Sequence, residues 1–210
     1  MSFDTVAPHY RWMELVLAGN KLQRCRTAFL NEIPEAGSIL ILGEGHGRFL
    51  PECCRAFPEA KIICVDASRK MLAIAEKKTA RAGANGKIEF VHADALDWTP
   101  RNSFDLIATH FFLDCFTPAQ LEILIPKIAS AAAPNSVWLI ADFQAPHAGL
   151  RRIRARLILQ TMYLFFRIVT RLPARRLTAP DEFLKQNGFS LRERRESEWG
   201  LLKSDFWERR

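Results

Sequence analysis

Apolar residues recur along the chain in two alternating patterns, short continuous runs and longer stretches with helical spacing. The short runs predict buried strands at 38–42, 61–65, 88–92, 104–109 and 137–141. The helical spacing predicts helices over 9–31, 47–57, 68–81 and 118–132. Strands that alternate with helices are typical of a parallel sheet with helices on both faces.

The pattern changes after residue 180. A short helix is expected at 181–187, because Gly188 is suited to end it. Residues 189–198 and 201–208 then predict two strands joined around Gly200. Two strands so close in sequence form an antiparallel hairpin. The expected fold is therefore an α/β, doubly wound, seven-stranded sheet of Rossmann-like type whose last strand is antiparallel.

The composition fits one globular unit. The chain has 210 residues, of which 49% are hydrophobic and 25% are charged, as is usual for soluble domains. Its length predicts one domain over residues 1–210. Within this domain we expect an N-terminal helical cap at 1–35 and an Arg-rich helical insertion at 148–180, after the fifth strand.

The location of the protein is predicted from what the sequence lacks. It has no run of about 18 apolar residues, so a transmembrane helix is not expected. The segment Met1-Ser2-Phe3-Asp4 lacks the basic and apolar regions of a signal peptide. Five cysteines without metal-ligand spacing indicate reduced thiols and no metal site. These features predict a cytoplasmic protein.

A glycine-rich turn follows the first predicted strand, in the segment Gly43-Glu44-Gly45-His46-Gly47. Glycines allow a tight turn and a close approach of a ligand to the backbone, and the helix beyond offers free N–H groups to an anion. The dinucleotide fingerprint would need a glycine where Arg48 stands. The Lys-Ser/Thr pair of phosphate-binding loops is also missing. A plain tight turn is the alternative interpretation.

Acidic residues end the next two strands. Asp66 lies nineteen residues after Gly47, where a carboxylate can accept both hydroxyls of a ribose. A helix cap is the alternative for Asp66. Asp94, in His92-Ala93-Asp94-Ala95, could accept a hydrogen bond from an exocyclic amine.

This order of features resembles the class I S-adenosylmethionine-dependent methyltransferases, over about residues 3–207. The resemblance implies methyl transfer as the activity and S-adenosyl-L-methionine as the cofactor. It also implies that the glycine loop faces the methionine part, that Asp66 holds the ribose, that Asp94 and Ala95 bound the adenine, and that residues 109–113 line the sulfonium. The residues expected to contact the cofactor are Gly43, Glu44, Gly45, Gly47, Asp66, Ala67, Asp94, Ala95, Thr109 and His110.

One departure from the family concerns the methionine amine. The family usually has an acid two residues before the first glycine, where this chain has Ile41. Glu44 could substitute for it, although from a different place in the loop. The departure leaves a non-catalytic, cofactor-binding relative as an alternative.

Methyl transfer from a sulfonium is an in-line displacement, so the protein mainly aligns the reactants. A base is needed only if the acceptor must lose a proton. The carboxyl ends of the parallel strands are where ligands bind, and His110 and Asp114 are the candidate catalytic residues there. Lower-ranked candidates are Asp142, His147, His9 and Tyr10.

The acceptor is predicted from the segment after the fourth strand. It lacks the Asn/Asp-Pro-Pro-aromatic motif that accompanies methylation of adenine or amide nitrogen in this family. His110-Phe111-Phe112-Leu113 provides an apolar wall instead. This argues for a small, apolar or lipid-like acceptor. An RNA or protein methyltransferase is the alternative, with the Arg-rich segment as its docking surface.

The net charge of +7 is concentrated in one segment. Residues 143–180 hold eight arginines and no Lys, Asp or Glu, which leaves the rest of the chain at −1. Residues 157–169 are apolar almost all round if helical, as in a helix that is buried or meets lipid. The interpretations left open are a peripheral membrane contact through 149–172, a core-covering helix and a homodimer interface. Nucleic acid is disfavoured, because no recognised binding module is present.

Overall fold

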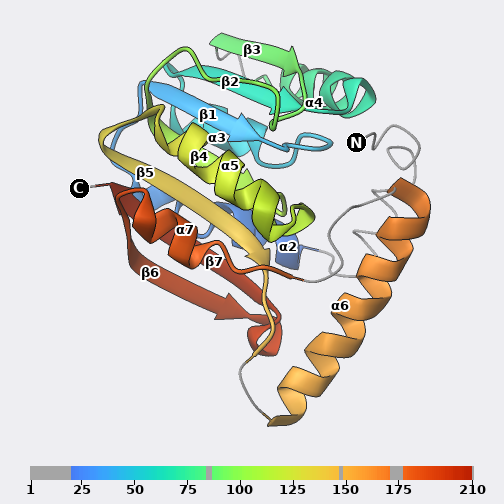
Figure 1. Ribbon diagram of the computed structural model, residues 1–210. Coiled ribbons are helices and arrows are strands. Elements are labelled where there is room, and N and C mark those ends of the chain that lie inside the picture. The colour runs from blue at the N-terminus through green and yellow to red at the C-terminus, as the bar shows by residue number, and fades with distance from the viewer. Residues whose placement is uncertain (1–19, 84–86, 147–148, 171–176, 210) are drawn as a thin grey trace.

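The computed structural model describes residues 20–83, 87–146, 149–170 and 177–209. Its centre is a seven-stranded sheet with the order β3-β2-β1-β4-β5-β7-β6 (Figure 1). The strands are β1 Ser38–Leu42, β2 Lys61–Asp66, β3 Lys87–His92, β4 Phe104–His110, β5 Ala132–Phe143, β6 Phe189–Ser197 and β7 Leu202–Arg209. Strands β1 to β5 pair in parallel and β7 is antiparallel to both of its neighbours. The predicted fold class is therefore confirmed.

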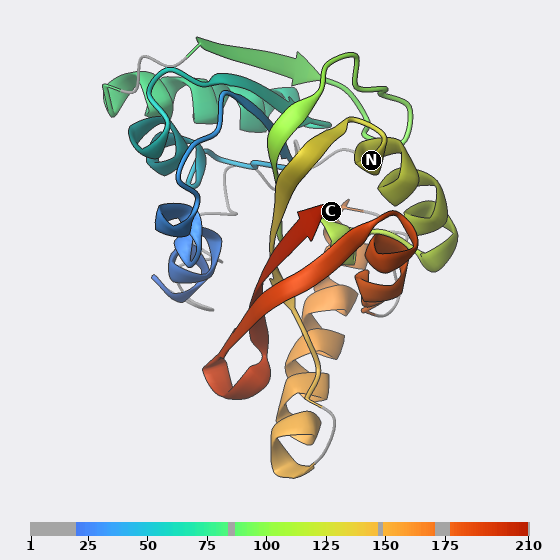
Figure 2. The same ribbon diagram turned by 90° about the vertical axis from the view of Figure 1, so that its left-hand side faces the viewer.

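Helices cover both faces of the sheet (Figure 2). They are α2 Lys21–Thr27, α3 Leu50–Ala56, α4 Arg69–Arg81, α5 Pro118–Ala129, α6 Gly149–Thr170 and α7 Asp181–Gln186. Three short 3-10 helices are η1 Leu30–Glu32, η2 Leu113–Cys115 and η3 Glu198–Gly200. Helices α5 and α7 pack with Trp138 and Trp207 on one face, while η1 and α3 pack with Ile39 and Ile41 on the other.

The helix starts follow the local chemistry of the sequence. The Ser68 hydroxyl accepts from the N–H of Met71 and caps α4. Thr117 and Gln120 form a reciprocal capping box at α5, with Pro118 at the first helical position. Such caps depend on residues a few positions apart, so the sequence predicts them well.

Some boundaries differ from the predictions. Helix α3 begins at Leu50 and not at residue 47, because Gly47 has a left-handed φ of +70° that a helix does not allow. Strand β5 extends beyond 137–141 at both ends. The predicted helix at 9–31 is described only in part, and His9, Tyr10 and His147 lie outside the described residues. None of the helices, as far as they are described, is long and apolar enough to cross a membrane.

Candidate functional site

The glycine loop needs glycine at Gly43, Gly45 and Gly47, all of which have a positive φ. At Gly43 an added Cβ would lie 2.2 Å from the Phe112 ring, and at Gly47 it would lie 2.6 Å from Cα of Ala75. At Gly45 an added Cβ would meet nothing within 4 Å. The loop is thus packed at both ends and open in the middle, where a ligand can approach the backbone.

Asp66 joins the ends of β1 and β2. One carboxylate oxygen accepts from the N–H of Gly45 at 3.0 Å and the other from the N–H of Ser68 at 2.8 Å. Ser68, and not Asp66, caps α4, so a helix cap does not explain this buried acid. A carboxylate at the end of this strand, beside the glycine loop, is in the position from which a ribose diol is bound in open α/β sheets.

Glu44 acts at the start of α3. One oxygen of its carboxylate accepts from the N–H groups of Phe49 and Leu50, at 2.9 and 3.0 Å. Burial raises the pKa of this carboxyl from 4.5 to about 7, although the two backbone hydrogen bonds and Arg26 oppose the rise. The side chain that was expected to replace the family's missing acid therefore already stabilises a helix N-terminus.

The pKa of Glu44 predicts a pH dependence of stability. Between pH 4.5 and about 7 the folded state binds more protons at Glu44 than the unfolded state, so the free energy of unfolding falls as pH rises through this window. Glu44→Gln removes the titration. We expect its stability relative to the wild type to improve by on the order of 3 kcal/mol from pH 4.5 to pH 7.5, as measured by urea unfolding at each pH. Parallel stability profiles of the two proteins would contradict the raised pKa.

The residues predicted to bound the adenine, Asp94 and Ala95, come just after β3. Asp94 Oδ1 accepts from the N–H of Leu96 at 3.0 Å, and its carbonyl accepts from the N–H groups of Asp97 and Trp98. Ala95 is buried in the apolar core. The carbonyl of Ala67 lies 3.2 Å from His92 Nε2. Because β3 pairs with β2, this turn lies beside the turn that follows Asp66.

Of the residues at the end of β4 and just after it, Thr109 does not face the site. Its hydroxyl accepts from the indole N–H of Trp138 at 2.9 Å and is fully buried. Leu113 is likewise part of the core. Phe112 packs its ring over Gly43. The side chains of residues 109–113 therefore form no continuous wall, because they point to different sides of the backbone.

His110 is buried against the Phe49 ring, with ring centroids 4.5 Å apart. Its Nδ1 accepts from the N–H of Ala141 at 3.1 Å, so in the neutral ring the proton is on Nε2. Burial, and then the charge of Arg26, lower the pKa of His110 to about 3. Nε2 has no partner among the described residues. The ring therefore offers a hydrogen-bond donor and is a poor base.

Asp114 and Asp142 form a buried carboxyl pair at the ends of β4 and β5. The Asp142 carboxylate accepts from the backbone N–H of Asp114, and Oδ1 also accepts from the N–H of Phe143 at 2.8 Å. Burial raises the pKa of Asp114 to about 6 and raises that of Asp142 well above its usual value, the latter also through the charge of Asp114. Asp114 is thus the better base candidate.

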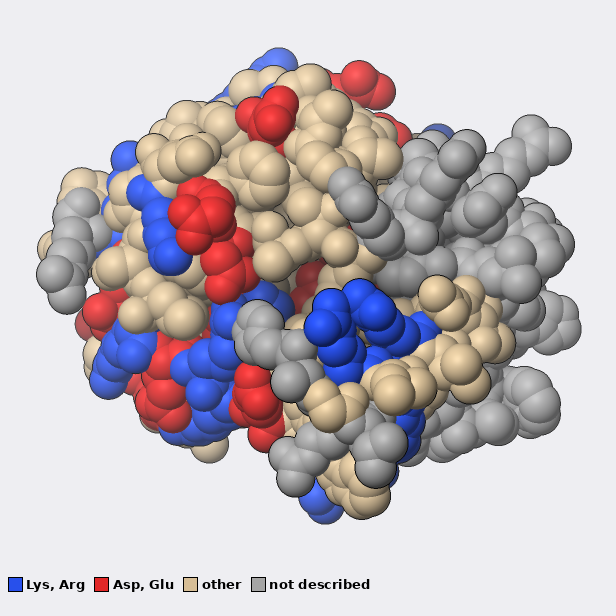
Figure 3. Space-filling model, turned by 60° about the horizontal axis from the view of Figure 1, so that its bottom comes forward, with Lys and Arg blue, Asp and Glu red and all other residues tan. Residues whose placement is uncertain are grey.

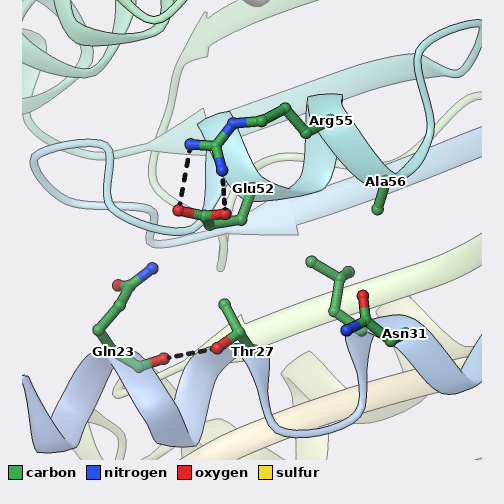
Figure 4. A pocket seen from close by; sticks show the side chains of 7 residues that line it. Gln23, Thr27, Asn31, Glu52, Arg55 and Ala56 are labelled. Atoms are coloured by element: carbon green, nitrogen blue, oxygen red, sulfur yellow. Dashed lines mark hydrogen bonds and ion pairs between the residues drawn. The ribbon is translucent and has the colours of Figure 1, made fainter.

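A separate hollow of about 450 Å³ lies between α2 and α3 (Figure 4). Its lining includes Gln23, Asn31 and the ion pair of Arg55 with Glu52. None of the predicted cofactor or catalytic residues lines it. It is therefore not the site built by the strand ends.

Comparison with known proteins finds similarity to methyltransferases. The model of the methyltransferase domain matches residues 39–135, which include the glycine loop, Asp66 and Asp94. The fold is that of solved methyltransferases as well. A putative O-methyltransferase from Nostoc punctiforme superposes with a TM-score of 0.73 at 20% identity, covering 97% of this chain and 59% of that one. Residues 39–135 thus match the methyltransferase domain, and the fold over nearly the whole chain is that of class I S-adenosylmethionine-dependent methyltransferases.

Two curated methyltransferases show the range of relatives. A trans-aconitate 2-methyltransferase of Streptomyces avermitilis is 31% identical over 125 residues, which cover 58% of this chain and 46% of the relative. A ubiquinone/menaquinone biosynthesis C-methyltransferase of Pseudomonas putida is 28% identical over 148 residues, which cover 69% of this chain and 57% of the relative. The chain thus spans about half the length of these relatives.

A solved structure of similar fold and length contains the demethylated cofactor. The magnesium protoporphyrin IX methyltransferase of Synechocystis, solved with bound SAH, has a TM-score of 0.68 at 16% identity and covers 99% of this chain and 96% of that one. The match to the methyltransferase domain favours S-adenosylmethionine as the cofactor. The open Gly45 and the position of Asp66 beside it are compatible with this cofactor.

One residue of this candidate site was missed by the sequence analysis. Lys203 on β7 is 3% exposed, and its charge lowers the pKa of Asp142. It also forms ion pairs with Asp181 and Asp205. No sequence signal indicated it, because its place beside Asp142 arises only when β7 pairs with β5.

Proposed function

We propose that this chain transfers a methyl group from S-adenosylmethionine to a small acceptor of apolar or lipid-like character. The observation that carries the proposal is the Asp66 carboxylate bound to the Gly45 amide, at the adjacent ends of two parallel strands. There Asp66 would hold the ribose, while the open middle of the glycine loop would face the methionine part. The cofactor supplies the activated methyl group, and the protein aligns it with the acceptor.

The residues on the acceptor side support a proton-accepting and a hydrogen-bonding role. Asp114, with a pKa of about 6, is largely ionised at neutral pH and would take the proton of an acceptor O–H or N–H. His110 would donate a hydrogen bond from Nε2. The rings of Phe111 and Phe143, with centroids 5.2 Å apart, provide apolar surface at the same strand ends.

The named acceptors of the relatives support a small molecule. The curated relatives act on trans-aconitate or in ubiquinone and menaquinone biosynthesis. A macromolecular acceptor, RNA or protein, stays the alternative. A non-catalytic relative that only binds the cofactor is the second alternative.

The test follows the methyl group. The protein is incubated with methyl-labelled S-adenosylmethionine and separate lipid, metabolite, RNA and protein fractions of a strain that lacks it. We expect label in a small-molecule or lipid product, and Asp114→Asn should slow the transfer by about 100-fold or more without weakening cofactor binding, as general bases contribute 10²–10⁴-fold. Label in RNA or protein would contradict the acceptor class. Cofactor binding without transfer to any fraction would contradict catalysis.

A further inference from the structure

Three large apolar side chains are exposed at one end of the molecule. Ile153, Leu157 and Trp199 are 62%, 67% and 69% exposed, more than any other large apolar side chain in the part of the chain that the structure describes. Ile153 and Leu157 are one turn apart on α6, and Trp199 lies in η3 at the β6–β7 turn. The guanidinium of Arg154 lies 5.3 Å from the Trp199 ring centroid, which joins the two elements.

The exposed residues of α6 follow a regular order around the helix. Ala155 and Leu159 are buried and pack with Leu201, so they define the inner side of α6. At about 100° per residue, Ile153 and Leu157 lie opposite this inner side. Arg152 and Arg156 then lie on one flank of this apolar ridge and Arg154 on the other, all of them exposed. Figure 3 shows basic side chains gathered beside uncharged ones on this face.

The turn that carries Trp199 has an unusual backbone. Glu198, Trp199 and Gly200 have consecutive φ values of +52°, +62° and +82°. Left-handed conformations strain residues other than glycine and persist only where the surroundings hold them. Here Glu198 forms an ion pair with Lys21 at 2.5 Å, and Arg154 covers the indole. The strained turn holds Trp199 in an exposed position, which a turn without strain would not require.

We propose that these six residues, Arg152, Ile153, Arg154, Arg156, Leu157 and Trp199, form a surface that docks onto an anionic lipid bilayer. Apolar side chains, an interfacial tryptophan and flanking arginines are the components of peripheral membrane binding. The segment 143–180 contains no Asp or Glu that would repel anionic headgroups. The inference concerns docking and is independent of the proposed methyl transfer.

The same features disfavour other occupants. In a symmetric dimer the same patch would face itself, which would bring the arginines of two copies together. RNA would use the arginines but would gain little from an exposed ridge of Ile153 and Leu157. An anionic bilayer can bind the arginines through its headgroups and the apolar side chains through its acyl chains. The side chains of residues 162–170, which belong to the predicted contact at 149–172, lie outside the described residues.

The test uses the full chain and co-sedimentation with vesicles of phosphatidylcholine, with and without phosphatidylglycerol. We expect binding only to the anionic vesicles. The variant Arg152→Gln/Arg154→Gln/Arg156→Gln should bind them roughly 100-fold more weakly, since each basic residue near an anionic surface contributes about fivefold. Ile153→Ser/Leu157→Ser should bind at least roughly 10-fold more weakly even in high salt, where the apolar contribution persists.

Matched controls separate the patch from net charge and general hydrophobicity. Lys77→Gln/Arg81→Gln/Arg101→Gln removes three exposed charges elsewhere, and Ile123→Ser removes a 60% exposed side chain on α5. Both should bind like the wild type. The proposal is overturned by equal binding to neutral vesicles, by full binding of the patch variants, or by loss of binding in the controls. A preference for RNA, or a dimer that the patch variants dissociate, would overturn it as well.

Discussion

Replacing Asp66 with alanine is expected to weaken the binding of S-adenosylmethionine about 10- to 150-fold. The change removes a charged hydrogen-bond acceptor for the ribose hydroxyls, worth roughly 1.5–3 kcal/mol. It also releases the Gly45 amide, to which the carboxylate now binds at 3.0 Å. Isothermal titration calorimetry with S-adenosylmethionine and with its demethylated product measures the effect.

Asp105 provides the matched control for this variant. Its carboxylate also accepts two backbone N–H groups, those of Gly37 and Ser38 at 3.0 and 2.9 Å, but near the opposite ends of the strands. Asp105→Ala should lose comparable local hydrogen bonds and keep full affinity for the cofactor. Undiminished binding by Asp66→Ala would refute the ribose assignment. A preference of the wild type for a nicotinamide dinucleotide would refute the cofactor.

Gly47→Ala is expected to destabilise the fold by about 2–5 kcal/mol. An alanine at a left-handed φ costs about 1–2 kcal/mol, and the new methyl group would lie 2.6 Å from the backbone Cα of Ala75, which adds the cost of overpacking. In a chain of this length each kcal/mol lowers the melting temperature by about 2–4 °C. Thermal unfolding without cofactor should therefore show a loss of roughly 5–15 °C.

Gly45→Ala separates the backbone strain from the clash. Gly45 has a similar φ of +63°, but its added methyl group would meet nothing within 4 Å. We therefore expect a loss of only about 1–2 kcal/mol in stability, together with weaker cofactor binding because the methyl group enters the open middle of the loop. Equal losses of melting temperature in the two variants would show that the approach of α4 to Gly47 is not as close as the structure has it.

The features that the sequence predicted correctly depend on local patterns. Apolar runs of five or six residues identify strands such as β1, and Ser68 and Thr117 identify helix starts, because the interacting groups lie within one turn of each other. The place of Asp66 beside the glycine loop was predictable too. Adjacent parallel strands bring their carboxyl ends together, so a residue at the end of β2 lies next to the end of β1.

The features that the sequence could not predict depend on which strands and helices are neighbours. Glu44 was expected to face the cofactor, but the start of α3 uses its carboxylate. Thr109 was expected to line the site, but Trp138 on the neighbouring strand binds its hydroxyl. The exposed position of Trp199 arises from a left-handed backbone conformation, which tryptophan disfavours. Trp138 lies 29 positions from Thr109 in sequence. Phe49 and Leu50 are only five and six positions from Glu44, but no motif marks that contact.

The position of β7 between β5 and β6 has a consequence for how the sheet is completed. Its pairing with β5 joins Phe143 to Leu202, which lie 59 positions apart with all of α6 between them. Until this long loop closes, β5 remains an edge strand with unpaired backbone groups that another chain can pair with. The α6 segment therefore does more than present a surface. The rate at which the segment containing α6 allows β7 to pair with β5 determines how long the edge of β5 can pair with another chain and aggregate.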